Sequence, residues 1–203
     1  MGITDYEERD GNRIHVTAII NWDQVEIGTG NEIGPYVCIG TDAQHTREPS
    51  EGKITIGDNN IFREYTTVHL PTRFTKQTRI DNNCYFMALS HVAHDCVVED
   101  DVIFSNNVIL GGHCHIMKGS QFGFNAIVHQ YQVVGSYCML GMGAIIPSKI
   151  RIEPGNIYAG NPAKYLRINS IGLERRNVSF PELKDEKYRY ETILTEMNRH
   201  YTK

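Results

Sequence analysis

The chain has 203 residues, of which 40% are hydrophobic and 22% are charged, and its formal net charge is −4. This apolar fraction excludes a disordered chain, and no stretch approaches the ~20 apolar residues of a membrane span. The acidic balance argues against nucleic acid as a partner, because phosphate binding needs a basic face. Residues 1–13 are polar and lack the apolar segment of a secretory signal. We therefore expect a cytoplasmic protein.

The cysteine content also favours a reducing compartment such as the cytoplasm. Five cysteines are an odd number, and none of them are spaced as C-x-x-C. This pattern indicates neither a disulfide framework nor a structural zinc site.

A six-residue apolar step begins near the N-terminus. It runs from Ile27 to Ile39 and resumes at Ile56, after an interval of seventeen residues. Because seventeen is not a multiple of six, an insertion must lie between the two runs. Residues 41–53 contain proline and glycine, and we expect a loop there.

From Ile56 to Tyr158 every sixth residue is apolar, over eighteen consecutive positions. The residues between these two ends are Phe62, Val68, Phe74, Ile80, Phe86, Val92, Val98, Phe104, Leu110, Ile116, Phe122, Val128, Val134, Leu140, Ile146 and Ile152. Neither a helix, with its period of 3.6, nor an alternating strand, with its period of 2, repeats every six residues. The pattern predicts a parallel β-helix built from hexapeptide repeats, with three sides of six residues in each coil. About eight coils at roughly 4.8 Å each would stand about 40 Å tall.

Two other positions of the six-residue repeat (the hexad) also take a restricted set of residue types. Two residues before the large apolar position the side chains are mostly small, and they include Cys84, Cys96, Cys114 and Cys138. We interpret these cysteines as core residues rather than nucleophiles. Three residues after it come Asn, Asp and Gly, which tolerate tight or left-handed turns. The period leaves the hand of the coil open, although the usual crossover preference favours a right-handed one.

After the coils, the chain is expected to be helical. Ser179 before Pro181 resembles the start of a helix, and Leu183, Tyr190 and Met197 repeat every seven residues. We divide the chain into a β-helix over residues 1–163 and a helical segment over residues 164–203. The narrow apolar stripe of this helix is suited to packing on a neighbour, and we expect an oligomer.

Residues eighteen apart would lie above one another on the same side of the coil. His94, Gly112 and Gln130 form one such column, and Asp95 and His113 begin the next. A histidine can remove a proton from a hydroxyl group, and a carboxylate beside it can fix its tautomer. A glycine leaves its N–H group open to an oxyanion.

Two other interpretations of the same columns stay open. Exposed positions of a β-helix take polar residues in any case, so the columns would also suit a solvated surface. A metal site is the other alternative, with three imidazoles from adjoining sides. Its candidate ligands are His91, His94, His113, His115 and His129.

Residues 90–96 read Ser-His-Val-Ala-His-Asp-Cys, and further motifs stand at residues 56–64, 110–113, 126–130 and 172–176. In this order the segments resemble one family, the UDP-N-acetylglucosamine acyltransferases of lipid A synthesis, whose His-x-x-His-Asp-Cys segment matches residues 90–96. The resemblance covers about residues 14–177.

The resemblance implies a left-handed β-helix that forms a homotrimer with active sites between subunits. It implies transfer of an acyl chain from the 4′-phosphopantetheine thioester of acyl carrier protein to the 3-hydroxyl of UDP-N-acetylglucosamine, without a metal or cofactor. His94 would be the general base, Asp95 would orient it, and the Gly112 N–H would meet the oxyanion. Residues that would bind substrate are His91, His113, His129, Gln130, Asn169, Arg175 and Arg176. Met142 would limit the length of the acyl chain.

Departures from the family pattern favour rival functions. His45 or a neighbour in the loop of residues 41–53 stands where the family has an aspartate near the sugar, and Ile171 stands where a glutamate is expected. Both favour an enzyme that acylates another nucleotide-linked amino sugar, as in surface polysaccharide synthesis. A metalloenzyme like the γ-carbonic anhydrases and a noncatalytic scaffold trimer are the alternatives from other functional classes.

Overall fold

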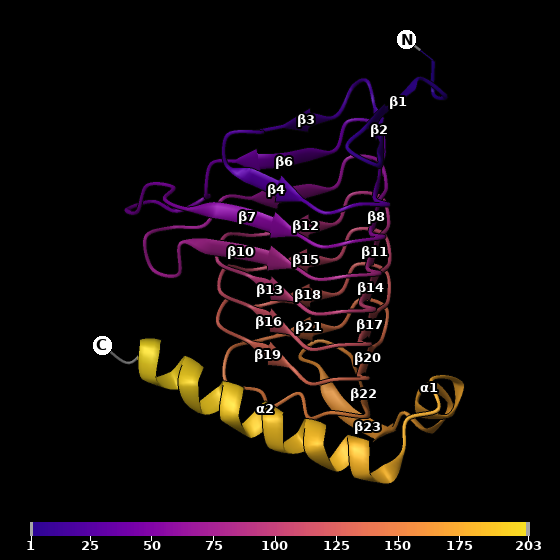
Figure 1. Ribbon diagram of the computed structural model, residues 1–203. Helices are drawn as coiled ribbons and strands as arrows, with labels where there is room; N and C mark the ends of the chain where they lie inside the picture. The colour runs from indigo at the N-terminus through magenta and orange to yellow at the C-terminus, as the bar shows by residue number, and fades with distance from the viewer. Residues whose placement is uncertain (1, 202–203) are drawn as a thin grey trace.

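The structure is a computed structural model that describes residues 2–201, with side chains up to residue 199. Positions 1, 202 and 203, which the predicted division of the chain includes, lie outside the described residues. Within this range the strands form the three sides of a prism, and each coil visits the sides in turn (Figure 1).

The strands fall into a first, a second and a third sheet. The first contains β1 (Tyr6–Arg9), β2 (Asn12–His15), β5 (Glu32–Ile33), β8 (Ile61–Phe62), β11 (Tyr85–Phe86), β14 (Ile103–Phe104), β17 (Gln121–Phe122), β20 (Met139–Leu140), β22 (Asn156–Ala159) and β23 (Lys164–Ile168). The second contains β3 (Ile19–Ile20), β6 (Cys38–Thr41), β9 (Thr67–His69), β12 (His91–Val92), β15 (Ile109–Leu110), β18 (Ile127–Val128) and β21 (Ile145–Ile146). The third contains β4 (Val25–Ile27), β7 (Lys53–Ile56), β10 (Gln77–Ile80), β13 (Val97–Val98), β16 (His115–Ile116) and β19 (Val133–Val134).

The register confirms the predicted coil of eighteen residues. Phe86 pairs with Phe104, and Phe104 pairs with Phe122, in parallel strands. The hairpin strands β1 and β23 pair antiparallel with β2 and β22, so each end of the first sheet finishes in a hairpin. Residues eighteen apart therefore lie in neighbouring strands, as the column argument requires.

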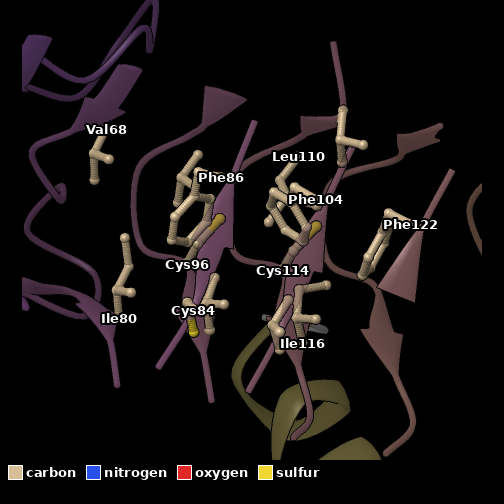
Figure 2. Packing of buried hydrophobic residues seen from close by; sticks show 14 of the residues in the cluster. Val68, Ile80, Cys84, Phe86, Cys96, Phe104, Leu110, Cys114, Ile116 and Phe122 are labelled. Atoms are coloured by element: carbon tan, nitrogen blue, oxygen red, sulfur yellow. The ribbon is translucent and has the colours of Figure 1, made fainter. Parts of the chain in front are cut away.

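Inside the coils, large side chains stack in a row along the axis, beside a second row of small side chains. The rings of Phe62 and Phe86 stack with centroids 4.9 Å apart, and Phe104 follows at 5.2 Å from Phe86. Figure 2 shows Phe86, Phe104 and Phe122 in successive coils. All of the small residues from the expected position are buried: Cys84, Ser90, Cys96, Val102, Val108, Cys114, Ser120, Ala126, Cys138 and Ala144. Burial raises the pKa of the Cys84 thiol to about 12, which suits a core residue.

The predicted turn positions have the left-handed backbone that their residue types favour. Asn59, Asn83, Asp95 and Asn107 all have φ near +57° to +59°. These residues let the chain turn a corner after each side of the prism.

The periodic pattern wrongly predicted that Phe74 lies in the core, since its side chain is 57% exposed. The register explains the error. Ile56 pairs with Ile80, twenty-four residues later, so the coil between them carries six extra residues. An insertion of one full hexad leaves the period unbroken while it moves Phe74 into the loop between β9 and β10.

The C-terminal segment is only partly helical, since it begins with strand β23 and continues into α1 (Ser170–Arg175) and α2 (Phe180–Tyr201). The Ser179 hydroxyl accepts a hydrogen bond from the Glu182 N–H at 3.3 Å, which confirms the predicted cap of α2. The stripe of α2 packs on this chain's own third sheet, where Tyr190 is buried against Met117 and Val133.

Candidate active site

The second and third sheets meet along one edge of the prism, formed by residues 93–96, 111–114, 129–132 and 147–150. We call it the histidine edge. The N–H of His113 donates to the carbonyl of His94 at 3.0 Å, and the N–H of Tyr131 donates to the carbonyl of Gly112 at 3.0 Å. These bonds fix the predicted columns above one another. The left-handed position of these turns holds Asp95, His113, Tyr131 and Lys149, although Asn or Gly would be less strained there.

His94 and Asp95 form a close pair in the turn between β12 and β13. His94 Nδ1 lies 2.7 Å from Asp95 Oδ2, and both residues are buried. With Nδ1 held in this way, the imidazole presents Nε2 away from the carboxylate, which is the arrangement of an oriented general base.

Asp95 is anchored by threonines from the β9–β10 loop. Its Oδ2 accepts from the N–H and hydroxyl of Thr72 at 3.1 and 2.8 Å, and its Oδ1 accepts from the N–H and hydroxyl of Thr75. The Asp95 N–H donates to Thr78 Oγ1 at 2.9 Å. Burial alone would raise the pKa of this carboxyl, but the hydrogen bonds from His94, Thr75 and Thr72 outweigh it and lower the pKa to about 2. Asp95 is therefore ionised at neutral pH.

Gly112 lies directly against the imidazole of His94. A Cβ at this position would lie 2.5 Å from Cε1 and 2.6 Å from Nε2 of His94, so only glycine leaves room for the ring. The Gly112 N–H donates no hydrogen bond to any residue in the described range. It is thus an unused donor beside the candidate base, as an oxyanion site requires.

Further rings surround His94. His45, from the loop between β6 and β7, meets it edge to face at 5.4 Å, and His113 does so at 5.0 Å. His113 in turn stacks on Tyr131 at 4.5 Å and has Phe74 at its edge at 5.8 Å. The two inserted loops therefore supply part of the site.

His91 belongs to a neighbouring pair on the second sheet. Its Nδ1 lies 2.7 Å from the hydroxyl oxygen of Thr67, and its ring meets the buried ring of His69 at 4.8 Å. His69, Thr72 and Thr75 are not among the site residues predicted from the sequence. His69 ends β9, and Thr72 and Thr75 lie in the loop after it, an insertion that the unbroken six-residue period concealed.

Two of these buried histidines give the fold a predictable sensitivity to acid. Burial, together with His69 and His94, lowers the pKa of His91 to about 4, and burial also lowers that of His113 to about 4. Both rings stay neutral in the folded chain when they would protonate in the unfolded one, at about pH 6.5. The stability is therefore complete above pH 6.5 and is lost as the pH falls towards 4.

We expect the free energy of unfolding to fall by at least about 1.4 kcal/mol, the equivalent of one pKa unit, between pH 7 and pH 4.5. Urea unfolding followed by circular dichroism measures this slope. A His91→Gln/His113→Gln variant is the control and should show a shallower slope; an equal slope in both proteins would contradict the prediction.

His129 and Gln130 are exposed one coil further along the histidine edge. They open onto a groove of about 640 Å³ that runs from Phe74 past Tyr131 to the end of α2. The structure thus brings His129 and Gln130 to the same edge as His94.

The other predicted binding residues lie elsewhere on the chain. Arg175 and Arg176 line a separate hollow of about 360 Å³ beside β17 and β20. Asn169 is there too, with its side chain capping α1 at Gly172 N and donating to the carbonyl of Tyr137. Figure 1 shows α1 on the opposite side of the prism from the inserted loops.

Met142 is 73% exposed in the turn between β20 and β21, where the first and second sheets meet. A single chain therefore does not bring Met142 or the α1 residues to His94.

The metal alternative retains one candidate cluster in the described chain. His94, Asp95 and His113 each offer a ligand atom within 4.8 Å of the others. The shortest of these contacts, between His94 and Asp95, is a hydrogen bond of 2.7 Å. His115 is not part of the cluster, because its Nε2 lies 2.7 Å from Glu99 Oε1 on the third sheet.

Comparison with known proteins decides the family. Residues 77–112 match the family model described as bacterial transferase hexapeptide (six repeats). The chain is 37% identical over 169 residues to an acyl-[acyl-carrier-protein]–UDP-N-acetylglucosamine O-acyltransferase of Gloeothece citriformis (strain PCC 7424), covering 83% of this chain and 60% of that one. A solved UDP-N-acetylglucosamine acyltransferase from Bacteroides fragilis 9343 superposes with a TM-score of 0.80 at 30% identity, covering 94% of this chain and 78% of that one. The chain belongs to the UDP-N-acetylglucosamine acyltransferase family.

The left-handed parallel β-helix implied by the resemblance is confirmed by this family membership. The chain spans about 60% of the length of the curated relatives it matches. Neither helix of residues 2–201 combines the length and apolarity needed to cross a lipid bilayer.

Proposed function

We propose that this protein is an O-acyltransferase that moves an acyl chain from acyl carrier protein to the 3-hydroxyl of UDP-N-acetylglucosamine. The observation that supports the proposal most directly is the oriented His94–Asp95 pair beside the open N–H of Gly112. The name of the Gloeothece citriformis relative gives the acyl carrier protein donor, the UDP-N-acetylglucosamine acceptor and O-acyl transfer.

The reaction needs one base and one oxyanion donor. His94 Nε2 takes the proton of the acceptor hydroxyl while the hydroxyl oxygen bonds to the thioester carbon. The carbonyl electron pair moves onto oxygen, where the Gly112 N–H stabilises the charge. Collapse of the tetrahedral intermediate breaks the carbon–sulfur bond, and the imidazolium returns its proton to the thiolate. Asp95 stabilises that imidazolium, because its depressed pKa keeps it ionised.

A homotrimer would complete the site. The histidine edge, the α1 residues and Met142 lie on different parts of one chain, so one ligand reaches all of them only between copies. In this arrangement His91, His113, His129 and Gln130 line the cleft, while Asn169, Arg175 and Arg176 approach it from a neighbouring copy.

The test is a screen of donors against acceptors. Acyl carrier protein and coenzyme A thioesters are paired with UDP-N-acetylglucosamine and other UDP-sugars. The proposal predicts the highest kcat/KM for the carrier-protein donor with UDP-N-acetylglucosamine, and a chelator leaves that rate unchanged because no step needs a metal. A complete absence of transfer, or a rate restored only by zinc, would exclude the proposal.

The same screen tests a second acceptor. The ring centroid of His45 lies 5.4 Å from that of His94, in the loop where the resemblance expects an aspartate, and Ile171, at the position of an expected glutamate, is exposed within α1. Both favour a different nucleotide-linked amino sugar. Preference for such a sugar over UDP-N-acetylglucosamine would replace the first acceptor and leave the chemistry unchanged.

Met142→Gly should shift the donor preference towards longer acyl chains, by about tenfold in relative kcat/KM, because the exposed side chain would no longer block the end of the chain. Competition between donors of graded length measures the shift. Met142→Leu conserves the volume and should keep the wild-type profile. An unchanged profile in Met142→Gly would remove Met142 from this role.

A further inference from the structure

His45 carries a hydrogen-bond donor that the acyl-transfer mechanism does not use. Its Nδ1 accepts hydrogen bonds from the backbone N–H groups of Arg47 and Glu48, at 3.3 and 3.0 Å. An imidazole nitrogen that accepts hydrogen bonds carries no hydrogen of its own, so the ring hydrogen is on Nε2. Within the described part of the chain this Nε2 has no hydrogen-bond partner, which leaves its N–H group open to a ligand.

This donor lies beside the candidate base. The half-buried ring of His45 meets the ring of His94 edge to face, with the centroids 5.4 Å apart. Nδ1 of His94 lies 2.7 Å from Asp95 Oδ2, which leaves His94 Nε2 for the acceptor hydroxyl. A substrate whose hydroxyl group lies at His94 Nε2 therefore has the substituents next to that hydroxyl within reach of His45.

The loop that carries His45 is held in place by the loop after β9. Nε and Nη2 of Arg73 lie 2.6 and 3.0 Å from the two carboxylate oxygens of Glu48. Bidentate pairs of this kind are the strong form of an ion pair, and the Glu48 side chain is only 12% exposed. Ser50 and Thr72 form an antiparallel bridge between the same two loops, which lie side by side in Figure 1.

The same contacts fix His45 relative to the His94–Asp95 pair. Thr72, at the bridge, donates its hydroxyl hydrogen to Asp95 Oδ2 at 2.8 Å. The backbone of Glu48, whose side chain pairs with Arg73, holds Nδ1 of His45. One pair of loops thus positions both the carboxylate behind the base and the open N–H of His45, so this donor is preorganised for binding.

The chemistry of the donor limits the group that it can bind. An imidazole N–H only donates, so the ligand must present an acceptor. In an N-acylated amino sugar, the carbon beside the 3-hydroxyl carries an amide, and the carbonyl oxygen of this amide only accepts. That oxygen extends further from the sugar ring than a hydroxyl oxygen does, and it can therefore span from His94 to His45. A free amino group has no such oxygen, and in its charged form it only donates.

We propose that His45 determines specificity for an N-acylated amino sugar, by donating from Nε2 to the amide carbonyl beside the reacting hydroxyl. The assignment rests on the proposed function for the place of the acceptor. It applies to UDP-N-acetylglucosamine and equally to another N-acylated nucleotide sugar. His45 acts in binding and takes no part in proton transfer.

Isothermal titration calorimetry of the full-length chain with UDP-N-acetylglucosamine and with UDP-glucosamine tests the assignment, because the two ligands differ only in the acetyl group. We expect the wild-type protein to bind the acetylated ligand about tenfold more tightly, the equivalent of one hydrogen bond. Equal affinity for the two ligands would overturn the assignment.

Two amide variants separate the donor from the loop contact. In His45→Asn the amide oxygen takes the place of Nδ1 as acceptor for the loop, but no donor remains at the place of Nε2. His45→Gln carries the same amide one carbon further, with its NH₂ group near the place of Nε2. We expect His45→Asn to weaken UDP-N-acetylglucosamine about tenfold and to leave UDP-glucosamine unchanged, whereas His45→Gln keeps the wild-type preference.

The control is Gln44→Asn, an exposed neighbour in the same loop that should change neither affinity. Equal weakening of both ligands by His45→Asn, or no weakening of either, would overturn the role of Nε2. Loss of the preference in both His45 variants would assign His45 to holding the loop and would also overturn the proposal.

The two proposals fail separately. Protein that binds with the expected preference but transfers no acyl chain contradicts the proposed function and leaves the role of His45 standing. Protein that transfers acyl chains with the same KM for both sugars contradicts the role of His45 alone. Where transfer occurs, His45→Asn should raise KM for the acetylated acceptor about tenfold and leave KM for the acyl donor unchanged.

Discussion

His94→Ala is expected to lower kcat about a thousandfold, within the range contributed by a positioned general base. The variant keeps the oxyanion donor and the substrate-lining residues, so KM should change little. Asp95 keeps its hydrogen bonds from Thr72 and Thr75, so its charge stays paired with donors and the chain should fold. Steady-state kinetics with acyl carrier protein donors measure the loss.

The matched control for this prediction is His115→Gln. His115 lies on the third sheet with its Nε2 2.7 Å from Glu99, and the glutamine amide can donate in its place. We expect the control to retain wild-type turnover. Circular dichroism and light scattering should show both variants folded and in the same oligomeric state. More than a tenth of wild-type turnover in folded His94→Ala would exclude His94 as the base.

Gly112→Ala is expected to lower kcat about a hundredfold, because small misplacements of a catalytic group cost that much. The added Cβ would occupy the space of the imidazole, at 2.5 Å from Cε1 of His94. The ring must then turn away from Asp95, and the hydrogen bond of 2.7 Å between them is lost. The pH–rate profile should also change, since the base loses its carboxylate partner.

A double-mutant cycle distinguishes this mechanism from a general loss of folding. In His94→Ala/Gly112→Ala the space above residue 112 is free, so the second substitution should add little to the loss from His94→Ala. Gly111→Ala offers a contrast, because its Cβ would lie 2.6 Å from the backbone nitrogen of Gln130 and should destabilise the coil itself. Fully additive losses in the double variant would contradict the steric account.

The repeat predicted most of the coil correctly because each hexad satisfies the same local requirements. A large side chain, a small side chain and a turn residue recur, and backbone pairing then stacks residues eighteen apart. Cys96 and Cys114 are buried in neighbouring coils as expected, and His94 lies above Gly112 for the same reason. The resemblance to the family added the left-handedness of the β-helix, which the six-residue period does not determine.

The six-residue pattern led to a wrong prediction where an insertion had the same length as the repeat. Phe74 keeps the six-residue step but lies in a loop, because the coil from Ile56 to Ile80 holds twenty-four residues. No local feature of Phe74 distinguishes it from a core residue. Only pairing between β7 and β10 revealed the extra hexad.

By itself, the sequence determined the coil, its inward and outward positions apart from Phe74, and the two adjoining columns that place His94, Asp95 and Gly112 together. These features depend on spacing along the chain, which a regular backbone converts directly into distance. The tertiary structure decided the rest: the threonines that hold Asp95, the approach of His45 to His94, and the groove between α2 and Lys149. Those contacts join loops and a helix whose paths follow no period, so their positions are set by packing against distant parts of the chain.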